Sequence, residues 1–303
     1  MAARLTPALD APTFTALTPL LGRLPRDRFP RHDELNAMTM PSVVSGGGVP
    51  IRFVAPAPPS KEFSAQYEVR IFERGEVQTR ADNWHDLFNA LVWLAFPKTK
   101  AVLNGHHYEE IRARRGEPLR GTARDVLTLF DEGGIVVASA DAELSALLLE
   151  FRWKELFWRH RAEVLRSVRF YVFGHAIYEK ALEPYKGVTA KALILDCEPA
   201  LLEAPLERQL PELDARAADY FSGEGPLPQR TLCRRSLSSV FQAGSRATSA
   251  RRITTTPRSS GRGALDPKGM PGWSARCRER SPRGGACPPV RGPRLCAKSA
   301  RPP

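Results

Sequence analysis

The charge of the chain changes sign near residue 230, and this break constrains what each part can fold into. Residues 230–303 carry 17 Lys+Arg and 2 Asp+Glu, a net charge of +15 in a chain whose total is +12. Residues 1–229 therefore carry 28 basic and 31 acidic side chains, a net charge of −3. The basic segment is rich in Arg, Ser, Gly and Pro, and such a composition buries too little apolar surface to offset chain entropy. We therefore expect a disordered tail over residues 223–303, after a folded body.

Three origins of this basic tail are open. Clustered Arg side chains neutralise phosphates, so a genuine tail could bind nucleic acid, and then only non-specifically. A solvated disordered tail without a partner is the second origin. The third, which we favour, is a frameshift: codons read one base earlier between Val240 and Gly263 permit the string GIPGWQPGNERAEDYYDTPVFRPG without a stop.

The body is long enough for one domain with a substantial core. We divide it into an N-terminal wrapping segment, residues 1–44, and a core domain, residues 45–222. Its longest apolar run, LVWLAF at 91–96, is far shorter than the about 18 residues that a membrane span needs. The N-terminus has no continuous apolar segment typical of a signal peptide, and the body has a single cysteine, Cys197. We therefore expect a soluble, cytoplasmic protein.

Strand and helix patterns follow one another irregularly along the body. Two hairpins are predicted, one pairing 67–72 with 77–80 and one pairing 126–130 with 135–139. Further strands are expected at 51–56, 169–173 and 190–196, and helices at 84–96, 98–114, 142–168, 175–182 and 206–221. Because there is no regular βαβ rhythm, the pattern predicts an α+β fold, with mixed helices and short hairpins around one core.

The segment WHDLFNALVWLAF at 84–96 is the clearest helix. Asp82 or Asn83 can cap its start, and Pro97 ends it. Apolar residues occupy nearly its whole circumference, which is typical of a helix in the centre of a core.

Several segments resemble a bacterial family known as domain of unknown function 3025. They are YEVRIFERGEVQTRADNWHDLFNALVWLAFPKTKAVLNGHH, LTLFDEGG and FGHAIYEKALEPYKGVTAKAL. The resemblance covers about residues 15–225, is most specific in NWHDLFNALVWLAFP, and implies a shared fold but no activity. The resemblance also implies a C-terminal GIPGW segment followed by an aromatic-acidic stretch and FRP. The shifted reading frame contains these features and the given frame lacks them.

His85, His175 and Glu179 are the candidate catalytic residues. Both histidines stand at the start of predicted helices that follow strand-like segments, and such starts often open on one edge of an α+β core. We therefore expect the two imidazoles to lie close together with a carboxylate nearby. Glu179, one turn after His175, could orient its ring. The alternative is that each histidine packs locally or satisfies buried backbone groups.

A divalent metal is the possible cofactor, with His85, Asp86, Asp131, Glu132 and His175 as candidate ligands. Two imidazoles and a carboxylate suit an ion that activates water. Asp131 and Glu132, however, precede two glycines in a predicted hairpin turn, where acidic residues are also ordinary turn chemistry. The spacing of His106 and His107 matches no known zinc motif, so we expect an exposed polar patch there.

Two function classes remain open. One is a metal-assisted or acid–base enzyme of hydrolase type, with His85 and His175 in one pocket. The other is a non-enzymatic binding or scaffold protein, whose tryptophans build a core or an interface. The body contains no GxSxG, P-loop or CxxC motif that would decide between them. Histidines on opposite sides of the core would exclude a single site.

Overall fold

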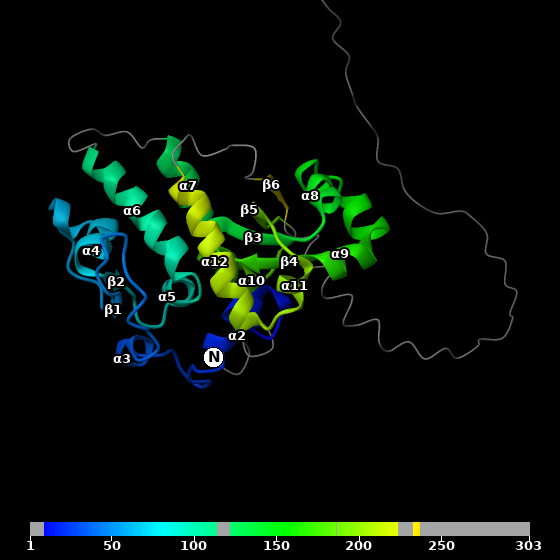
Figure 1. Cartoon of the computed structure of the whole chain (residues 1–303). Coiled ribbons are helices and arrows are strands. Elements are labelled where there is room, and N and C mark those ends of the chain that lie inside the picture. The colour runs from blue at the N-terminus through cyan, green and yellow to red at the C-terminus, as the bar shows by residue number, and fades with distance from the viewer. Residues whose placement is uncertain (1–8, 114–121, 186, 224–232, 237–303) are drawn as a thin grey trace, which may run out of the picture. The chain divides into compact units, whose positions relative to one another are not determined.

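A four-stranded sheet lies at the centre of the computed structural model, which describes residues 9–113, 122–185, 187–223 and 233–236 (Figure 1). The strand order is β4-β3-β5-β6. The strands are β3 (Gly134–Ser139), β4 (Val168–Val172), β5 (Thr189–Asp196) and β6 (Cys233–Ser236). β3 pairs antiparallel with β4 and parallel with β5, and β6 runs antiparallel to β5. The predicted α+β class is confirmed.

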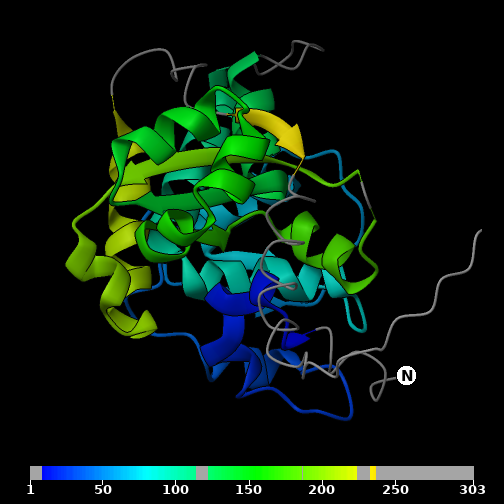
Figure 2. The same ribbon diagram turned by 90° about the vertical axis from the view of Figure 1, so that its right-hand side faces the viewer.

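Every residue of β3 is buried, which requires cover on both faces of the sheet. Helices α7 (Thr122–Gly133) and α12 (Leu206–Ser222) contact β3 and β5. Helices α8 (Ala142–Leu149) and α9 (Arg161–Ser167) lie on the side of the sheet away from α12 (Figure 1), and they face the viewer in the second view (Figure 2).

Helix α5 (Trp84–Ala95) confirms the predicted central helix. The Asn83 side chain accepts a hydrogen bond from the backbone N–H of Asp86, as an N-cap does. All residues from Leu87 to Trp93 are buried. Helix α6 begins at Pro97, directly after α5.

Helix α6 (Pro97–Ala113) runs through Gly105 without a break. Its start is capped from α12, because the Asp214 carboxylate accepts the backbone N–H groups of Lys98 and Thr99, each at 2.9 Å. Its buried positions at Lys100, Leu103, Asn104, His107 and Ile111 repeat at helical spacing. Three of these five side chains are polar, so α6 brings polar groups into the core.

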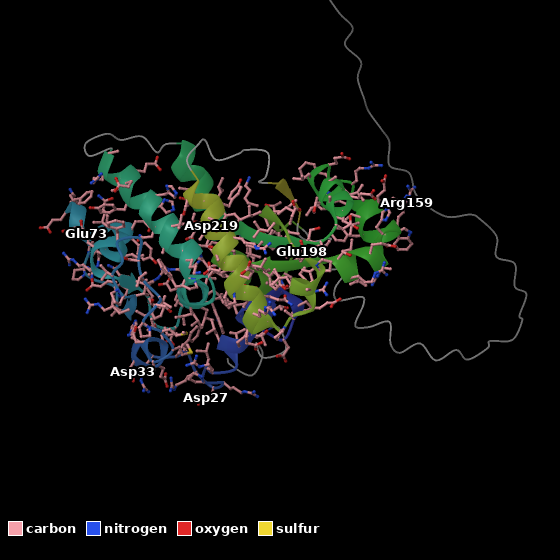
Figure 3. The ribbon with its side chains drawn as sticks, in the orientation of Figure 1. Asp27, Asp33, Glu73, Arg159, Glu198 and Asp219 are labelled. Atoms are coloured by element: carbon pink, nitrogen blue, oxygen red, sulfur yellow. The ribbon has the colours of Figure 1, made fainter. Side chains whose placement is uncertain are left out.

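Shorter elements complete the described part of the chain. They are η2 (Pro12–Leu17), α2 (Thr18–Leu21), α3 (His32–Asn36), β1 (Arg52–Val54), η3 (Phe63–Ala65), α4 (Tyr67–Arg74), β2 (Glu76–Gln78), η4 (Glu155–Arg159), α10 (His175–Leu182) and α11 (Pro199–Glu203). β1 and β2 pair in parallel. Charged side chains such as Glu73 and Arg159 extend from the periphery (Figure 3). Within the described residues no helix is both long and apolar enough to cross a membrane.

The predicted hairpin between 67–72 and 77–80 is wrong. Residues 67–74 form helix α4, and only 76–78 form a strand, whose partner is β1. A six-residue run with apolar side chains at every second position fits either conformation. Gly75 decides between helix and strand. It follows Arg74 directly and has a φ of 67°, and a glycine in this left-handed conformation commonly ends a helix.

The predicted hairpin between 126–130 and 135–139 is also wrong. Residues 126–130 belong to helix α7, while 134–139 form β3. Leu127 and Phe130, three residues apart, are buried, whereas Leu129 is exposed. In a strand Leu127 and Leu129 would lie on the same face, so this burial pattern is that of a helix. Asp131 and Glu132 therefore lie in the last turn of a helix and not in a hairpin turn.

Two further boundaries differ from the predictions. The helix expected over 142–168 is broken at Phe151, whose φ is 59°, into α8, the π-helical turn η4 and α9. Strand β6 (Cys233–Ser236) is a short strand inside residues 223–303, the segment predicted to be a disordered tail. The other residues from 224 onward lie outside the described part of the chain.

Candidate functional site

Two helix starts meet at the candidate site. His85 is the second residue of α5, and His175 is the first residue of α10. The two helices are held together by aromatic packing, with the rings of Phe88 and Tyr178 stacked at 5.5 Å. The structure thus brings together the two histidines that the sequence placed at helix starts.

Gly174 explains why His175 lies beside the end of α7. A Cβ atom at Gly174 would be 2.4 Å from the carbonyl oxygen of Glu132 and 2.5 Å from the backbone nitrogen of Gly134. Only a glycine permits this close approach. The backbone N–H of Gly174 also donates to the Gly134 carbonyl at 2.8 Å. The start of α10 is therefore tied to the α7–β3 junction, next to Asp131.

The imidazoles of His85 and His175 face each other. Their Nε2 atoms are 3.1 Å apart, and their rings meet edge to face at 4.5 Å. The Nδ1 atom of His85 is 3.0 Å from Oε2 of Glu179. The Nδ1 atom of His175 is 3.7 Å from Oδ2 of Asp131 and has no hydrogen-bond partner among the described residues. The order of groups is carboxylate, imidazole, imidazole, carboxylate.

A second polar chain continues from Asp131. The buried Lys100 ammonium lies 2.6 Å from Oδ1 of Asp131 and 2.9 Å from Oδ1 of Asn89. The Asn89 amide nitrogen in turn lies 2.7 Å from the hydroxyl oxygen of Tyr67. Helices α4, α5, α6 and α7 each contribute one of these residues. Lys100 thus joins the histidine pair to the tyrosine.

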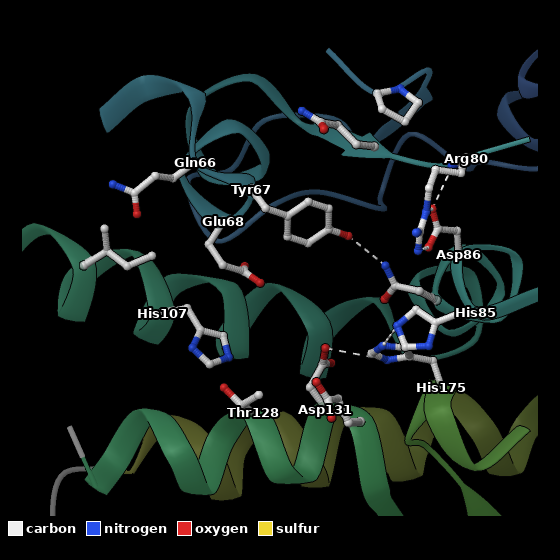
Figure 4. A pocket seen from close by; sticks show the side chains of 15 residues that line it. Gln66, Tyr67, Glu68, Arg80, His85, Asp86, His107, Thr128, Asp131 and His175 are labelled. Atoms are coloured by element: carbon white, nitrogen blue, oxygen red, sulfur yellow. Dashed lines mark hydrogen bonds and ion pairs between the residues drawn. The ribbon is translucent and has the colours of Figure 1, made fainter. Parts of the chain in front are cut away.

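Both chains open on one cavity of about 460 Å³ (Figure 4). Its walls are Pro56, Gln66, Tyr67, Glu68, Gln78, Arg80, His85, Asp86, Asn89, His107, Ile111, Thr128, Asp131, Glu132 and His175. The close view places His85, His175 and Asp131 toward one end and His107, Glu68 and Gln66 toward the other. The volume is within the range of small-molecule sites.

The candidate metal ligands line this cavity, but the structure commits two of them to cations of the protein. Asp86 accepts three hydrogen bonds from Arg80, at 2.7, 2.8 and 2.9 Å. Asp131 is paired with Lys100. Within the described ranges no group of three or more His, Cys, Asp or Glu is arranged to hold a metal ion. The five-residue metal set stays a prediction.

Three residues in or next to the cavity escaped the sequence analysis. His107 is buried and lines the cavity, so the expectation of an exposed patch at this position is wrong. Lys100 and Tyr67 were not singled out at all. The available signal was the spacing of Lys100, Asn104 and His107, which repeats as one helical face. It went unnoticed because polar residues at that spacing are usually exposed.

Burial and neighbouring charges set the ionisation of this site. Burial is the largest cause that lowers the pKa of His175, to about 4, and the charge of Lys100 lowers it further against the opposing effect of Asp131. Burial alone would raise the pKa of Asp131, but the charge and hydrogen bond of Lys100, together with His175 and His107, outweigh burial, and the pKa lies below its ordinary value. Burial, assisted by the charge of Glu68, raises the pKa of Tyr67 well above 10.

Stability should therefore depend on pH through His175. Its pKa of about 4 in the folded protein lies below the ordinary 6.5, so the unfolded chain binds more protons between these values. The free energy of unfolding should fall by about 3 kcal/mol as pH drops from above 6.5 to below 4. Asp131 and His85 face the ring, and Lys100 and Glu179 are bonded to these two residues. The lowered pKa of Asp131 adds a further loss at the acid end.

Urea denaturation at several pH values would measure this effect. The variant His175→Gln should show a shallower loss of stability between pH 6.5 and 4 than the wild-type chain. Parallel curves for the two proteins would contradict a buried neutral imidazole at this position.

Comparison with known proteins gives a family but no activity. A family model described as protein of unknown function (DUF3025) matches residues 51–234. The chain belongs to this family. The DUF3025 match begins later than the expected residue 15 and runs past 225 into β6, and it includes every residue of the site from Tyr67 to Glu179. Searches of curated proteins and of solved structures gave no significant match. The frameshift origin of the tail stays a prediction.

Proposed function

We propose that this DUF3025 protein is an acid–base enzyme of hydrolase type, in which the His85–His175 pair takes a proton from water and returns it to the leaving group. The observation that carries the proposal is the 3.1 Å contact between the two Nε2 atoms. The Glu179 carboxylate lies 3.0 Å from the outer nitrogen of His85, the Asp131 carboxylate lies 3.7 Å from that of His175, and both imidazoles line one cavity. Perturbed titratable groups that converge in a pocket are the usual mark of an active site.

Proton counting supports a role as a general base. The imidazole pair makes two hydrogen bonds: one between Glu179 and His85 Nδ1, and one between the two Nε2 atoms. Two neutral imidazoles supply two N–H protons, one for each of these hydrogen bonds. The free lone pair is then on the buried His175 Nδ1, which makes no hydrogen bond to the Asp131 carboxylate 3.7 Å away. One additional proton is taken up at this nitrogen.

Uptake of this proton gives the imidazole pair one positive charge, which we place on His85. Its side chain is 34 % exposed and faces the Glu179 carboxylate, which stabilises an imidazolium. His175 is buried, and burial holds its pKa at about 4, so it stays neutral. A proton that enters at His175 Nδ1 is therefore balanced by transfer of the bridging proton toward His85. His175 acts as a relay, while Glu179 orients His85 and stabilises its charge.

Substitution of His85 tests the proposal directly. Purified protein would be assayed with p-nitrophenyl acetate, p-nitrophenyl phosphate and p-nitrophenyl β-glucoside, which represent three classes of hydrolysis. Turnover of at least one class is expected for the wild-type protein. Loss of the general base in His85→Gln should lower kcat by about 10²–10⁴-fold. Glu179→Gln should lower kcat less, because His85 remains.

Two controls keep this test specific. His160→Gln changes a histidine outside the cavity, and Glu183→Gln changes an exposed carboxylate one turn after Glu179; both variants should retain wild-type kcat. Absence of turnover in all three classes would overturn the enzyme proposal in favour of a binding protein. Activity that is lost on chelation and restored by a divalent ion would overturn proton transfer by the imidazole pair alone.

A further inference from the structure

The direction of the hydrogen bonds from Lys100 to Tyr67 is fixed by chemistry. A lysine ammonium carries three donors and no acceptor. The Asn89 atom that lies 2.9 Å from Lys100 Nζ must therefore be the carbonyl oxygen Oδ1. The other end of the amide is then Nδ2, which donates to the hydroxyl oxygen of Tyr67 at 2.7 Å. Lys100 thus determines which way the Asn89 amide is turned.

This direction leaves the Tyr67 hydroxyl proton free for a ligand. The hydroxyl oxygen accepts from Asn89, and among the described residues no acceptor for the Tyr67 O–H is found. Tyr67 lines the cavity, and its ring extends toward the end that holds His85 and His175 (Figure 4). Tyr67 is 38 % exposed as a residue, and its phenol, with an ordinary pKa of about 10, is protonated at physiological pH. Burial of its hydroxyl end raises the pKa further, so the hydroxyl stays a donor.

The charge of the cavity wall determines which ligand groups can accept the hydrogen bond from Tyr67. The carboxylates of Glu68, Asp86, Asp131 and Glu132 line it, with Arg80 as the only lysine or arginine among the lining residues. Such a wall opposes entry of a phosphate dianion. A neutral carbonyl oxygen accepts a hydrogen bond without this penalty, so the wall favours an acyl group over a phosphoryl group.

We propose that Tyr67 is a further catalytic residue, which donates its hydroxyl proton in a hydrogen bond to the carbonyl oxygen of an acyl substrate, an ester or an amide. This rests on the proposed hydrolase function and names its substrate class. Water attacks the acyl carbon, its proton passes to the His85–His175 pair, and the C=O electron pair moves onto the oxygen that Tyr67 holds. When the carbonyl re-forms, the bond to the leaving group breaks, and the leaving group takes the proton back from the pair.

Tyr67→Phe is the first test. This variant keeps the ring and removes the donor. With p-nitrophenyl acetate, kcat should fall by about 10²–10³-fold while KM changes little, because the hydrogen bond strengthens as the oxyanion forms. Tyr108→Phe is the matched control, since the Tyr108 hydroxyl lies outside the cavity against Glu73, and it should retain wild-type kcat. Full activity of Tyr67→Phe would overturn the proposal.

Asn89→Asp is the second test, and it reverses the hydrogen bond. The new carboxylate still accepts from Lys100 but cannot donate to Tyr67, so the Tyr67 O–H turns toward it and away from the substrate. The expected kcat is as low as that of Tyr67→Phe, and the double variant should be no slower than either single variant. Multiplicative losses in the double variant would overturn the shared role.

A spectroscopic readout separates this inference from the enzyme proposal. In ultraviolet resonance Raman, the intensity ratio of the tyrosine Fermi doublet distinguishes a hydroxyl that accepts a hydrogen bond from one that donates. The difference between the wild-type and Tyr67→Phe spectra should be of the acceptor type. The difference between the Asn89→Asp and Asn89→Asp/Tyr67→Phe spectra should be of the donor type. Donor-type spectra in both backgrounds would overturn the inference even if hydrolysis is observed. If no substrate is turned over, the enzyme proposal fails, and acceptor-type wild-type spectra would still support the available proton.

Discussion

Replacing Lys100 by methionine should lower the free energy of unfolding by about 3–5 kcal/mol, because it leaves the Asp131 carboxylate buried without its cation. The Lys100 side chain is 6 % exposed and that of Asp131 17 % exposed, and their charged atoms are 2.6 Å apart. Lys100 also satisfies the Asn89 carbonyl, which would lose its donor as well. Urea or thermal denaturation of the two proteins would measure the difference.

Lys98→Met provides the matched control. Lys98 is an exposed lysine on the same helix, two residues earlier, so its substitution should change stability by no more than about 0.5 kcal/mol. The double variant Lys100→Met/Asp131→Leu should recover much of the lost stability, because it removes both charges together. A single-variant loss below about 1 kcal/mol would show that water or another cation reaches Asp131.

Replacing Trp93 by alanine should cost about 3–5 kcal/mol of unfolding free energy, the usual cost of removing a large buried aromatic side chain. Trp93 is 1 % exposed and lies at the end of the fully buried stretch of α5. The Lys100 ammonium lies 5.2 Å from the centre of its ring, which adds a cation–π contact. Denaturant unfolding monitored by circular dichroism is the suitable measurement, since it does not depend on tryptophan fluorescence.

Trp158→Ala is the corresponding control. Trp158 is 76 % exposed, so its loss should change stability by well under 1 kcal/mol. Because Trp93 and Lys100 are in contact, the losses in a Trp93→Ala/Lys100→Met variant should not be additive. A cost below about 1 kcal/mol for Trp93→Ala would contradict its place in the core.

Local signals mark several helix boundaries of the fold. Asn83 and Pro97 delimit α5, Asp141 caps α8 through the backbone N–H groups of Glu143 and Leu144, and Gly174 precedes α10. Each of these signals acts within a few residues of the boundary that it marks. The two predicted hairpins failed because a short apolar run satisfies helical and extended periodicity equally well.

The candidate site was predicted in part. His85 and His175 were placed together because both stand at helix starts, and Glu179 follows one turn after His175 at helical spacing. Lys100 and Tyr67 were missed, because nothing local distinguishes a buried lysine from the many exposed ones on helices. The chemical roles of all these residues remain proposals.

The sequence by itself determined where α5 and α10 begin, that the body is α+β, and that the chain resembles its family. These features follow from the types and spacing of residues that are neighbours along the chain, so they can be read from the sequence. Only the tertiary structure decided that Lys100 joins Asp131 to Asn89 and that Asn89 donates to Tyr67. These contacts join four different helices, and their directions follow from atoms that only folding brings within hydrogen-bond distance.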